Sequence, residues 1–211
     1  KNDKKDKENC MEEQLGTSRL APTGVGQTAE RRGLSVVLTG QSLLQADIRV
    51  DTPTAVQSIR PLLKGDVVFT NFETTIREEE DSVADLNPFI HVYAPPGALD
   101  ALKDLGFNLL ALSNNHAFDL GRTGILNTIR EVKARKLIHA GMGAHLHEAL
   151  APGYLRTADG TVALVSMASG LIHPGAAATQ STPGLNELHM VGTTPNVDAG
   201  RPNEEEAQRI L

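Results

Sequence analysis

The chain is poor in cysteine and in aromatic residues, and it has no tryptophan. Its 211 residues include one cysteine, Cys10, and aromatic residues make up 3% of the total. A single cysteine excludes an intrachain disulfide and any zinc site built from several cysteines. With so few aromatic side chains, we expect the hydrophobic core to consist mainly of aliphatic residues.

Long apolar runs and an excess of basic charge are lacking as well. No segment approaches the ~20 apolar residues that cross a bilayer, so we expect no membrane span and a soluble chain. The net charge is −6, and Lys and Arg are not clustered, which argues against binding to nucleic acid. We expect a polar or polyanionic substrate. The sequence leaves two localisations open: the cytoplasm, or a position outside it behind an anchor.

Two stretches differ in composition from the rest of the chain. Residues 1–33 are charged and polar at first and then rich in Gly, Thr and Pro, which predicts a flexible polar tail. Residues 170–203 hold many Gly, Pro, Ala and Thr without clear periodicity, which predicts a long surface loop that borders a site. Residues 34–211, with this loop, are predicted to form one domain.

From residue 34 onward, short apolar runs alternate with segments of helical periodicity. Strands are predicted at residues 34–38, 67–72, 107–112 and 137–139, followed by a hairpin at 154–165. Helices are predicted at residues 51–65, 95–106, 124–136 and 145–150, and a further helix begins at 204. This alternation predicts an α/β fold with a largely parallel sheet that is covered on both faces.

Polar clusters follow three of the predicted strands, at residues 40–49, 71–73 and 113–121. The loops at the carboxyl edge of a doubly wound sheet converge, so we expect Glu73, Asn115, His116 and also Asp47 to lie together there. A carboxylate, an amide oxygen and an imidazole suit Mn²⁺, Fe²⁺ or Zn²⁺. The sequence therefore predicts a divalent metal site, where a bound ion could lower the pKa of water.

The most specific motif is Leu-Leu-Ala-Leu-Ser-Asn-Asn-His-Ala-Phe-Asp-Leu-Gly at residues 109–121. Together with Asn-Phe-Glu at 71–73 and His-Ala-Gly-Met-Gly at 139–143, it resembles the CapA-like proteins of bacterial capsule and poly-γ-glutamate biosynthesis. These proteins belong to the calcineurin-like metallophosphoesterase superfamily. The resemblance runs in order from about residue 34 to 168, and it implies an α/β/β/α metallophosphoesterase-like sandwich.

The resemblance also implies roles for individual residues. Glu73 takes the position of the metal-bridging carboxylate, and Asn115 takes that of a second ligand. His116 would act as the general acid or steady the transition state, and Asp119 would orient His116 or its loop. The identity and number of the metal ions are left open.

Two departures from the family pattern affect the expected site. Gln41 stands where most members have an aspartate that binds metal. Asp47 could replace that ligand; alternatively, Arg49 could bind an anionic group of the substrate in the same space. The later His-Trp-Gly and Gly-x-His-x-His motifs do not occur, so we expect an N-terminal portion of a longer protein whose fold and site are incomplete.

Two functions follow from these observations. The first is a metal-dependent hydrolase of a phosphoester or amide-like bond, which Glu73, Asn115 and His116 favour. The alternative is a non-catalytic component of capsule biosynthesis that binds the polymer or organises partner proteins. Gln41 and the missing motifs favour this alternative.

Overall fold

The computed structural model describes residues 33–79, 92–170, 172–192 and 200–210. The predicted tail lies outside the described residues except for Gly33, and so do residues 193–199 of the predicted loop. The division of the chain into a tail and one domain therefore stays a prediction.

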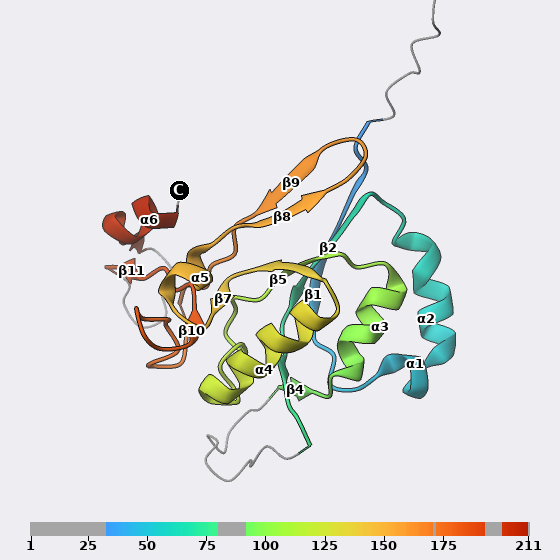
Figure 1. Cartoon of the computed structure of the whole chain (residues 1–211), viewed down its shortest axis with the longest axis horizontal. Coiled ribbons are helices and arrows are strands. Elements are labelled where there is room, and N and C mark those ends of the chain that lie inside the picture. Colours follow the sequence, from blue (N-terminus) through green and yellow to red (C-terminus); the bar gives the residue numbers. More distant parts are fainter. Residues whose placement is uncertain (1–32, 80–91, 171, 193–199, 211) are drawn as a thin grey trace, which may run out of the picture. The chain divides into compact units, whose positions relative to one another are not determined.

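Four parallel strands form the central sheet in the order β1-β2-β5-β6 (Figure 1). They are β1 (Val36–Ser42), β2 (Val67–Phe72), β5 (Leu109–Ala111) and β6 (Ile138–Ala140). The four predicted strands are confirmed, with their ends shifted by a few residues, and so is the α/β class. Because the strands are parallel, their carboxyl ends lie at one edge of the sheet.

The helices begin and end where the local sequence dictates. They are α1 (Ile48–Asp51), α2 (Pro53–Ile59), a 3-10 turn (Arg60–Leu62), α3 (Gly97–Leu105), α4 (Gly121–Ala134), α5 (Leu146–Leu150) and α6 (Glu204–Ile210). Pro53 begins α2, where a missing N–H is tolerated, whereas Pro61 falls in the 3-10 turn that ends it. Gly106, with φ of 104°, ends α3 in the left-handed conformation.

One face of the sheet packs against α2, α3 and α4. Val68 and Leu110 of the sheet share a buried cluster with Val56 of α2, Leu99 of α3 and Ile129 of α4. As expected, the residues of this cluster are mainly aliphatic. Burial of such side chains contributes about 1.5–3 kcal/mol each, so this face holds the helices on the sheet.

The opposite face is less completely covered at its β1 edge. Val36 is 46% exposed and Leu38 is 73% exposed. Successive strand residues point to opposite faces, so these two side chains share one face, and Val37 packs toward the core on the other. The expectation of a sheet covered on both faces is therefore not met at β1.

Short strand pairs lie outside the central sheet. The pairs are β3 (Thr75–Ile76) with β4 (Tyr93–Ala94), β7 (Met142–Gly143) with β10 (Gly184–Leu185), β8 (Gly153–Arg156) with β9 (Thr161–Leu164), and β11 (Met190–Val191) with β12 (Arg201–Pro202). The antiparallel β8–β9 pair confirms the predicted hairpin.

Residues 172–188, which we call the strap, differ from the surface loop predicted there. The strap pairs with β7 through β10 and buries Ala176, Leu185 and Asn186, each at most 1% exposed. A Cβ atom at Gly184 would lie 2.4 Å from the Ala176 carbonyl oxygen. Small residues let these backbones approach closely, and the strap therefore packs inside without showing any periodicity.

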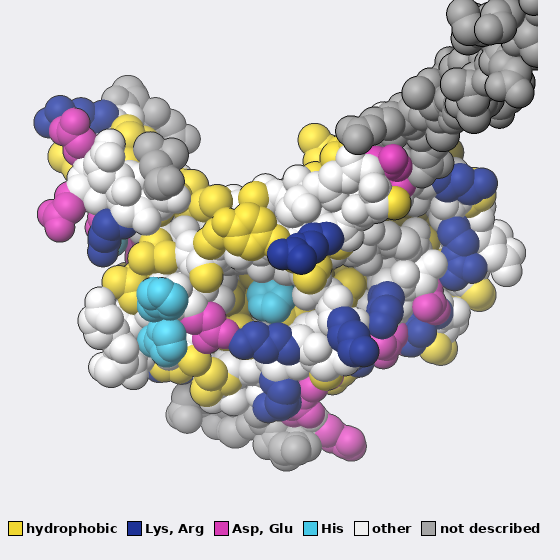
Figure 2. Space-filling model, turned by 45° about the horizontal axis from the view of Figure 1, so that its top comes forward, with side chains coloured by type: hydrophobic (Ala, Val, Ile, Leu, Met, Phe, Trp, Pro, Cys, Tyr) yellow, Lys and Arg dark blue, Asp and Glu magenta, His cyan; other side chains and the backbone are white. Residues whose placement is uncertain are grey.

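The face drawn in Figure 2 mixes Lys and Arg with Asp and Glu side chains, without a continuous basic stripe. The expectation that the chain does not bind nucleic acid stays a prediction. Within the described ranges, every helix is too short or too polar to cross a membrane.

The partly buried His139 side chain on β6 predicts a pH-dependent stability. Burial lowers its pKa, although Nδ1 lies 3.0 Å from the Leu137 carbonyl oxygen, and Lys133 and Glu148 lie nearby. An unfolded imidazole titrates near ~6.5, so below that pH the unfolded chain binds the extra proton and is favoured. The free energy of unfolding should therefore fall as pH decreases from about 6.5 toward the lower folded pKa.

Urea unfolding of the wild type and His139→Gln at pH 5.5 and 7.5 measures this contribution. We expect the stability difference between the two proteins to shrink at pH 5.5. His147→Gln, which changes an exposed histidine, is the control. Equal pH dependence in the wild type and His139→Gln would contradict the assignment.

Candidate functional site

Glu73 follows β2 directly and lies at the carboxyl edge of the sheet. Its backbone N–H donates to the Ser42 carbonyl oxygen at 3.1 Å, which ties it to the end of β1. The residue is 9% exposed, and Oε2 accepts a hydrogen bond of 3.0 Å from Asn71 Nδ2. A carboxylate this buried is costly unless it is hydrogen-bonded or paired, so Asn71 is part of what makes its position tolerable.

Asn114 connects this group to the loop after β5. Its Nδ2 donates to Asn71 Oδ1 at 3.1 Å and to the Phe72 carbonyl oxygen at 2.9 Å, and its Oδ1 accepts from the His116 N–H at 3.1 Å. Asn114 is 8% exposed, whereas Asn115 is exposed. The structure thus places Asn114 in the contacts with β2 and leaves the predicted ligand Asn115 on the surface of the same loop.

His116 pairs with Asp119 at the end of this loop. Nδ1 of His116 lies 2.9 Å from Asp119 Oδ2, which also accepts the Val92 N–H at 2.7 Å. The two side chains are 18% and 13% exposed. When Nδ1 donates its proton to the carboxylate, Nε2 is left as the atom that can accept or release a proton. Asp119 therefore contacts and orients the His116 ring, and the catalytic roles expected for the two residues stay predictions.

Gln41 lies beside this group on the neighbouring strand. It pairs in register with Asn71, across an irregularity in β1 between Leu38 and Gln41. Neighbours in register on parallel strands point to the same face, so Gln41 and Asn71 share a face. The position where the family has an aspartate is therefore next to Asn71.

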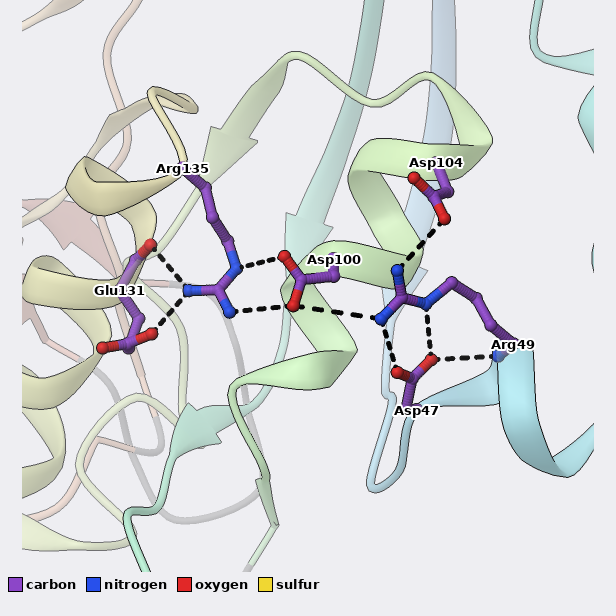
Figure 3. Close-up of polar contacts among 6 residues, drawn as sticks. All are labelled: Asp47, Arg49, Asp100, Asp104, Glu131 and Arg135. Atoms are coloured by element: carbon purple, nitrogen blue, oxygen red, sulfur yellow. Dashed lines mark hydrogen bonds and ion pairs between the residues drawn. The ribbon is translucent and has the colours of Figure 1, made fainter.

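Asp47 and Arg49 belong to a different cluster, drawn in Figure 3. Asp47 caps α1: Oδ1 accepts the Arg49 N–H at 3.0 Å, and Oδ2 lies 2.6 Å from Arg49 Nη2. Arg49 Nη1 reaches Asp104 of α3 at 3.1 Å. The hydrogen bonds from Arg49 lower the pKa of Asp47.

The same cluster continues from α3 to α4. Arg135 binds both carboxylate oxygens of Asp100 at 2.7 and 2.9 Å, and it contacts Glu131 at 2.5 Å. The hydrogen bond from Arg135 lowers the pKa of Asp100. As far as the described residues go, Asp47 and Arg49 join these helices and not the hydrogen-bonded group around Glu73. Their predicted roles toward metal and substrate stay predictions.

The described residues supply only part of a metal shell. Glu73 offers a carboxylate, but one of its oxygens already accepts from Asn71. In the described ranges, no group of three His, Cys, Asp or Glu side chains is placed to hold an ion. A structural or catalytic metal usually has three or four protein ligands, so these residues alone do not fit a complete site.

The chain is an α/β protein with a parallel sheet, and a His–Asp pair and a buried carboxylate lie at the carboxyl edge, where proteins of this class commonly bind ligands. Residues 21–209 match the family model of the bacterial capsule synthesis protein PGA_cap. The chain therefore belongs to this CapA-like capsule synthesis family.

Individual relatives agree with this membership. A Sinorhizobium fredii protein, y4sH, described as uncharacterized, is 31% identical over 178 residues, covering 80% of this chain and 38% of the relative. The capsule biosynthesis protein CapA of Bacillus anthracis is 28% identical, over 70% of this chain and 36% of its own length. The PGA biosynthesis protein CapA of Bacillus subtilis is 27% identical, over 61% and 34%. The chain thus spans between a third and two fifths of these relatives.

Asn71 and Asn114 were not among the predicted ligands. Asn71 is in β2, two residues before Glu73, which directly follows the strand, and the two side chains meet at 3.0 Å. For Asn114 and Asn115, the sequence carries no signal that separates the inward from the exposed residue, because the loop after β5 is irregular.

The contrast between these adjacent asparagines can be measured. Asn114→Ala leaves the Phe72 carbonyl oxygen, Asn71 and the His116 N–H without their partner, so we expect a loss of roughly 2–3 kcal/mol in the free energy of unfolding. Asn115→Ala should change it by less than about 0.5 kcal/mol. Urea unfolding of both variants measures these losses. Equal losses would contradict the assignment of Asn114 as the inward, hydrogen-bonded residue.

Proposed function

We propose that this chain carries part of the active site of a metal-dependent hydrolase of capsule or poly-γ-glutamate metabolism. The bond that it cleaves is a phosphoester or an amide-like bond in a polar or polyanionic substrate. The supporting observation is the hydrogen-bonded chain from Glu73 through Asn71 and Asn114 to His116. It joins a buried carboxylate to the backbone of His116, whose ring is oriented by Asp119, at the edge where α/β proteins bind ligands.

His116 is proposed as the general acid that protonates the leaving group. Asp119 holds the ring through Nδ1 and stabilises the imidazolium, and Nε2 delivers the proton. Because Asp119 Oδ2 also binds the Val92 N–H, the carboxylate is fixed by the backbone beside β4. The ring therefore does not need to reorganise when it transfers a proton.

Glu73 and Asn115 are the proposed contributors to a divalent metal site. When bound, such an ion would polarise the substrate and lower the pKa of water. The remaining ligands are proposed to come from segments beyond the described residues. The proposed α/β/β/α sandwich places a second sheet against the face with the exposed Val36 and Leu38 side chains.

Glu73→Gln and His116→Asn separate the two roles. Glu73→Gln keeps the shape but removes the charge, so we expect it to weaken binding of Mn²⁺ the most. His116→Asn should leave metal binding nearly intact and reduce turnover by ~10²–10⁴-fold, as expected for a lost proton donor. Elemental analysis beside phosphodiesterase turnover, in a full-length family protein with this sequence, measures both effects. Equal metal loss in both variants would show that His116 is a ligand.

The second candidate is a non-catalytic component that binds the polymer or organises partner proteins. Two observations favour it. Gln41 presents a neutral amide beside Asn71, and the described ranges hold no set of three ligand side chains of the metal-binding type. A neutral amide is a weaker ligand than a carboxylate for a hard cation.

Gln41→Asp distinguishes the two candidates. If the edge beside Asn71 is a metal site, the new carboxylate adds a charged ligand, and Mn²⁺ should bind at least ~10-fold more tightly in calorimetry. Gln45→Asp, which places the same charge on an exposed residue beyond β1, is the matched control. No gain in affinity at position 41 over position 45 would favour the non-catalytic component.

A further inference from the structure

Ser113 lies between β5 and Asn114, and residues outside this loop hold its backbone N–H and its side-chain hydroxyl. Its backbone N–H donates to Ser166 Oγ at 3.2 Å, and its own Oγ donates to the Asn186 carbonyl oxygen at 2.8 Å. Ser166 follows β9, and Asn186 lies in the strap. Ser113 and Ser166 are each 6% exposed, so water does not compete freely for these bonds.

Asn186 connects the strap to Gly141 and Ser166 by two further hydrogen bonds. Its N–H donates to the Gly141 carbonyl oxygen at 2.8 Å and its Nδ2 to the Ser166 carbonyl oxygen at 2.9 Å. The residue is 1% exposed. In the part of the chain that the structure describes, its Oδ1 is buried and has no hydrogen-bond partner. An unpaired buried acceptor destabilises a fold, so stability alone does not explain an asparagine here.

Rotating the Asn186 side-chain amide by half a turn would not give its unpaired oxygen a hydrogen-bond donor. Reversing it would place Oδ1 against the Ser166 carbonyl oxygen, and two acceptors would face each other. The bond from Nδ2 to Ser166 therefore sets the orientation of the side chain, and this bond connects the strap to the residue that holds Ser113.

The backbone around this group leaves little space for adjustment. Gly141, directly after β6, has φ of 105°, and a Cβ there would lie 2.7 Å from both Ser113 Cβ and Ser166 Oγ. Ser113 is thus enclosed by Gly141 at the end of β6, by Ser166 beyond β9 and by the strap. Its neighbour Asn114 makes the bonds to β2 and to the His116 N–H.

We propose that Ser166 and Asn186 are positioning residues, which set the place of the Asn114–His116 loop by holding Ser113. They contact neither the imidazole nor a substrate in this role and act through the loop. The effect on turnover rests on the proposed function, whereas the placement of the loop does not.

Ser166→Ala and Thr157→Ala form a matched pair for the test. Each removes a hydroxyl that accepts a backbone N–H, but Thr157 lies in the exposed β8–β9 turn, where it accepts from Asp159 and Gly160. Amide exchange of Ser113 and the chemical shifts of the His116 ring at one pH are followed by NMR, and urea unfolding gives the global stability.

In Ser166→Ala, we expect the Ser113 amide to exchange at least ~10-fold faster than the change in global stability explains. The chemical shifts of the His116 ring, recorded at one pH, should also change, because the distance from Nδ1 to Asp119 changes with the loop. Asn186→Ala should change the Ser113 exchange and the His116 ring signal in the same direction. It replaces Ser166→Ala as the test variant if Ser166→Ala does not fold. Thr157→Ala should change neither.

A turnover assay tests the one consequence of this proposal that depends on the proposed function. If the wild type is active, Ser166→Ala should lower kcat by about 10-fold to 10²-fold with little change in KM, because the proton donor is displaced. Wild-type values for the Ser113 exchange and the His116 ring shifts in both variants, with only a lower unfolding midpoint, would overturn the positioning role. Changed NMR observables in a full-length family protein with this sequence that shows no turnover would refute the hydrolase and uphold the positioning role.

Discussion

The side-chain amide of Asn114 is the contact on which the rest of the site depends. It spans two parallel strands, since it binds Asn71 and the Phe72 backbone on one side and the His116 N–H on the other. An amide can donate and accept at once, and a carboxylate or a hydroxyl could not replace all three bonds in this geometry. The buried Glu73 and the His116–Asp119 pair are held in one group by this single side chain and its neighbour Asn71.

Two further constraints hold the elements that surround this group. On the helical side, Arg49 and Arg135 join α1, α3 and α4 through carboxylates on each helix (Figure 3). Several of these groups are well exposed, so their ion pairs contribute little to the free energy of unfolding. Their main effect is on the relative placement of the helices. On the other side, the strap and Ser166 hold Ser113 through hydrogen bonds between uncharged groups. Ion pairs thus order the helices, whereas buried neutral hydrogen bonds order the site loop.

The agreement between sequence and structure is best where hydrophobic periodicity is strong. The strands at Val67–Phe72 and Leu109–Ala111 and the helices around Leu99 and Ile129 were predicted because each buries an apolar face that local pattern reveals. The two-residue strands at Thr75–Ile76 and Met142–Gly143 were not, because strands this short have no measurable period.

The sequence by itself determined the α/β class, the four strands of the sheet and the loops that carry Glu73 and His116. These depend on local apolar patterns and on the rule that parallel strands end at one edge. Only the tertiary structure decided that Asn114 turns inward while Asn115 stays exposed, that Asp47 and Arg49 pair with helices, and that the strap is partly buried. Each of these depends on contacts between residues far apart in the chain, and such contacts leave no period or spacing in the sequence.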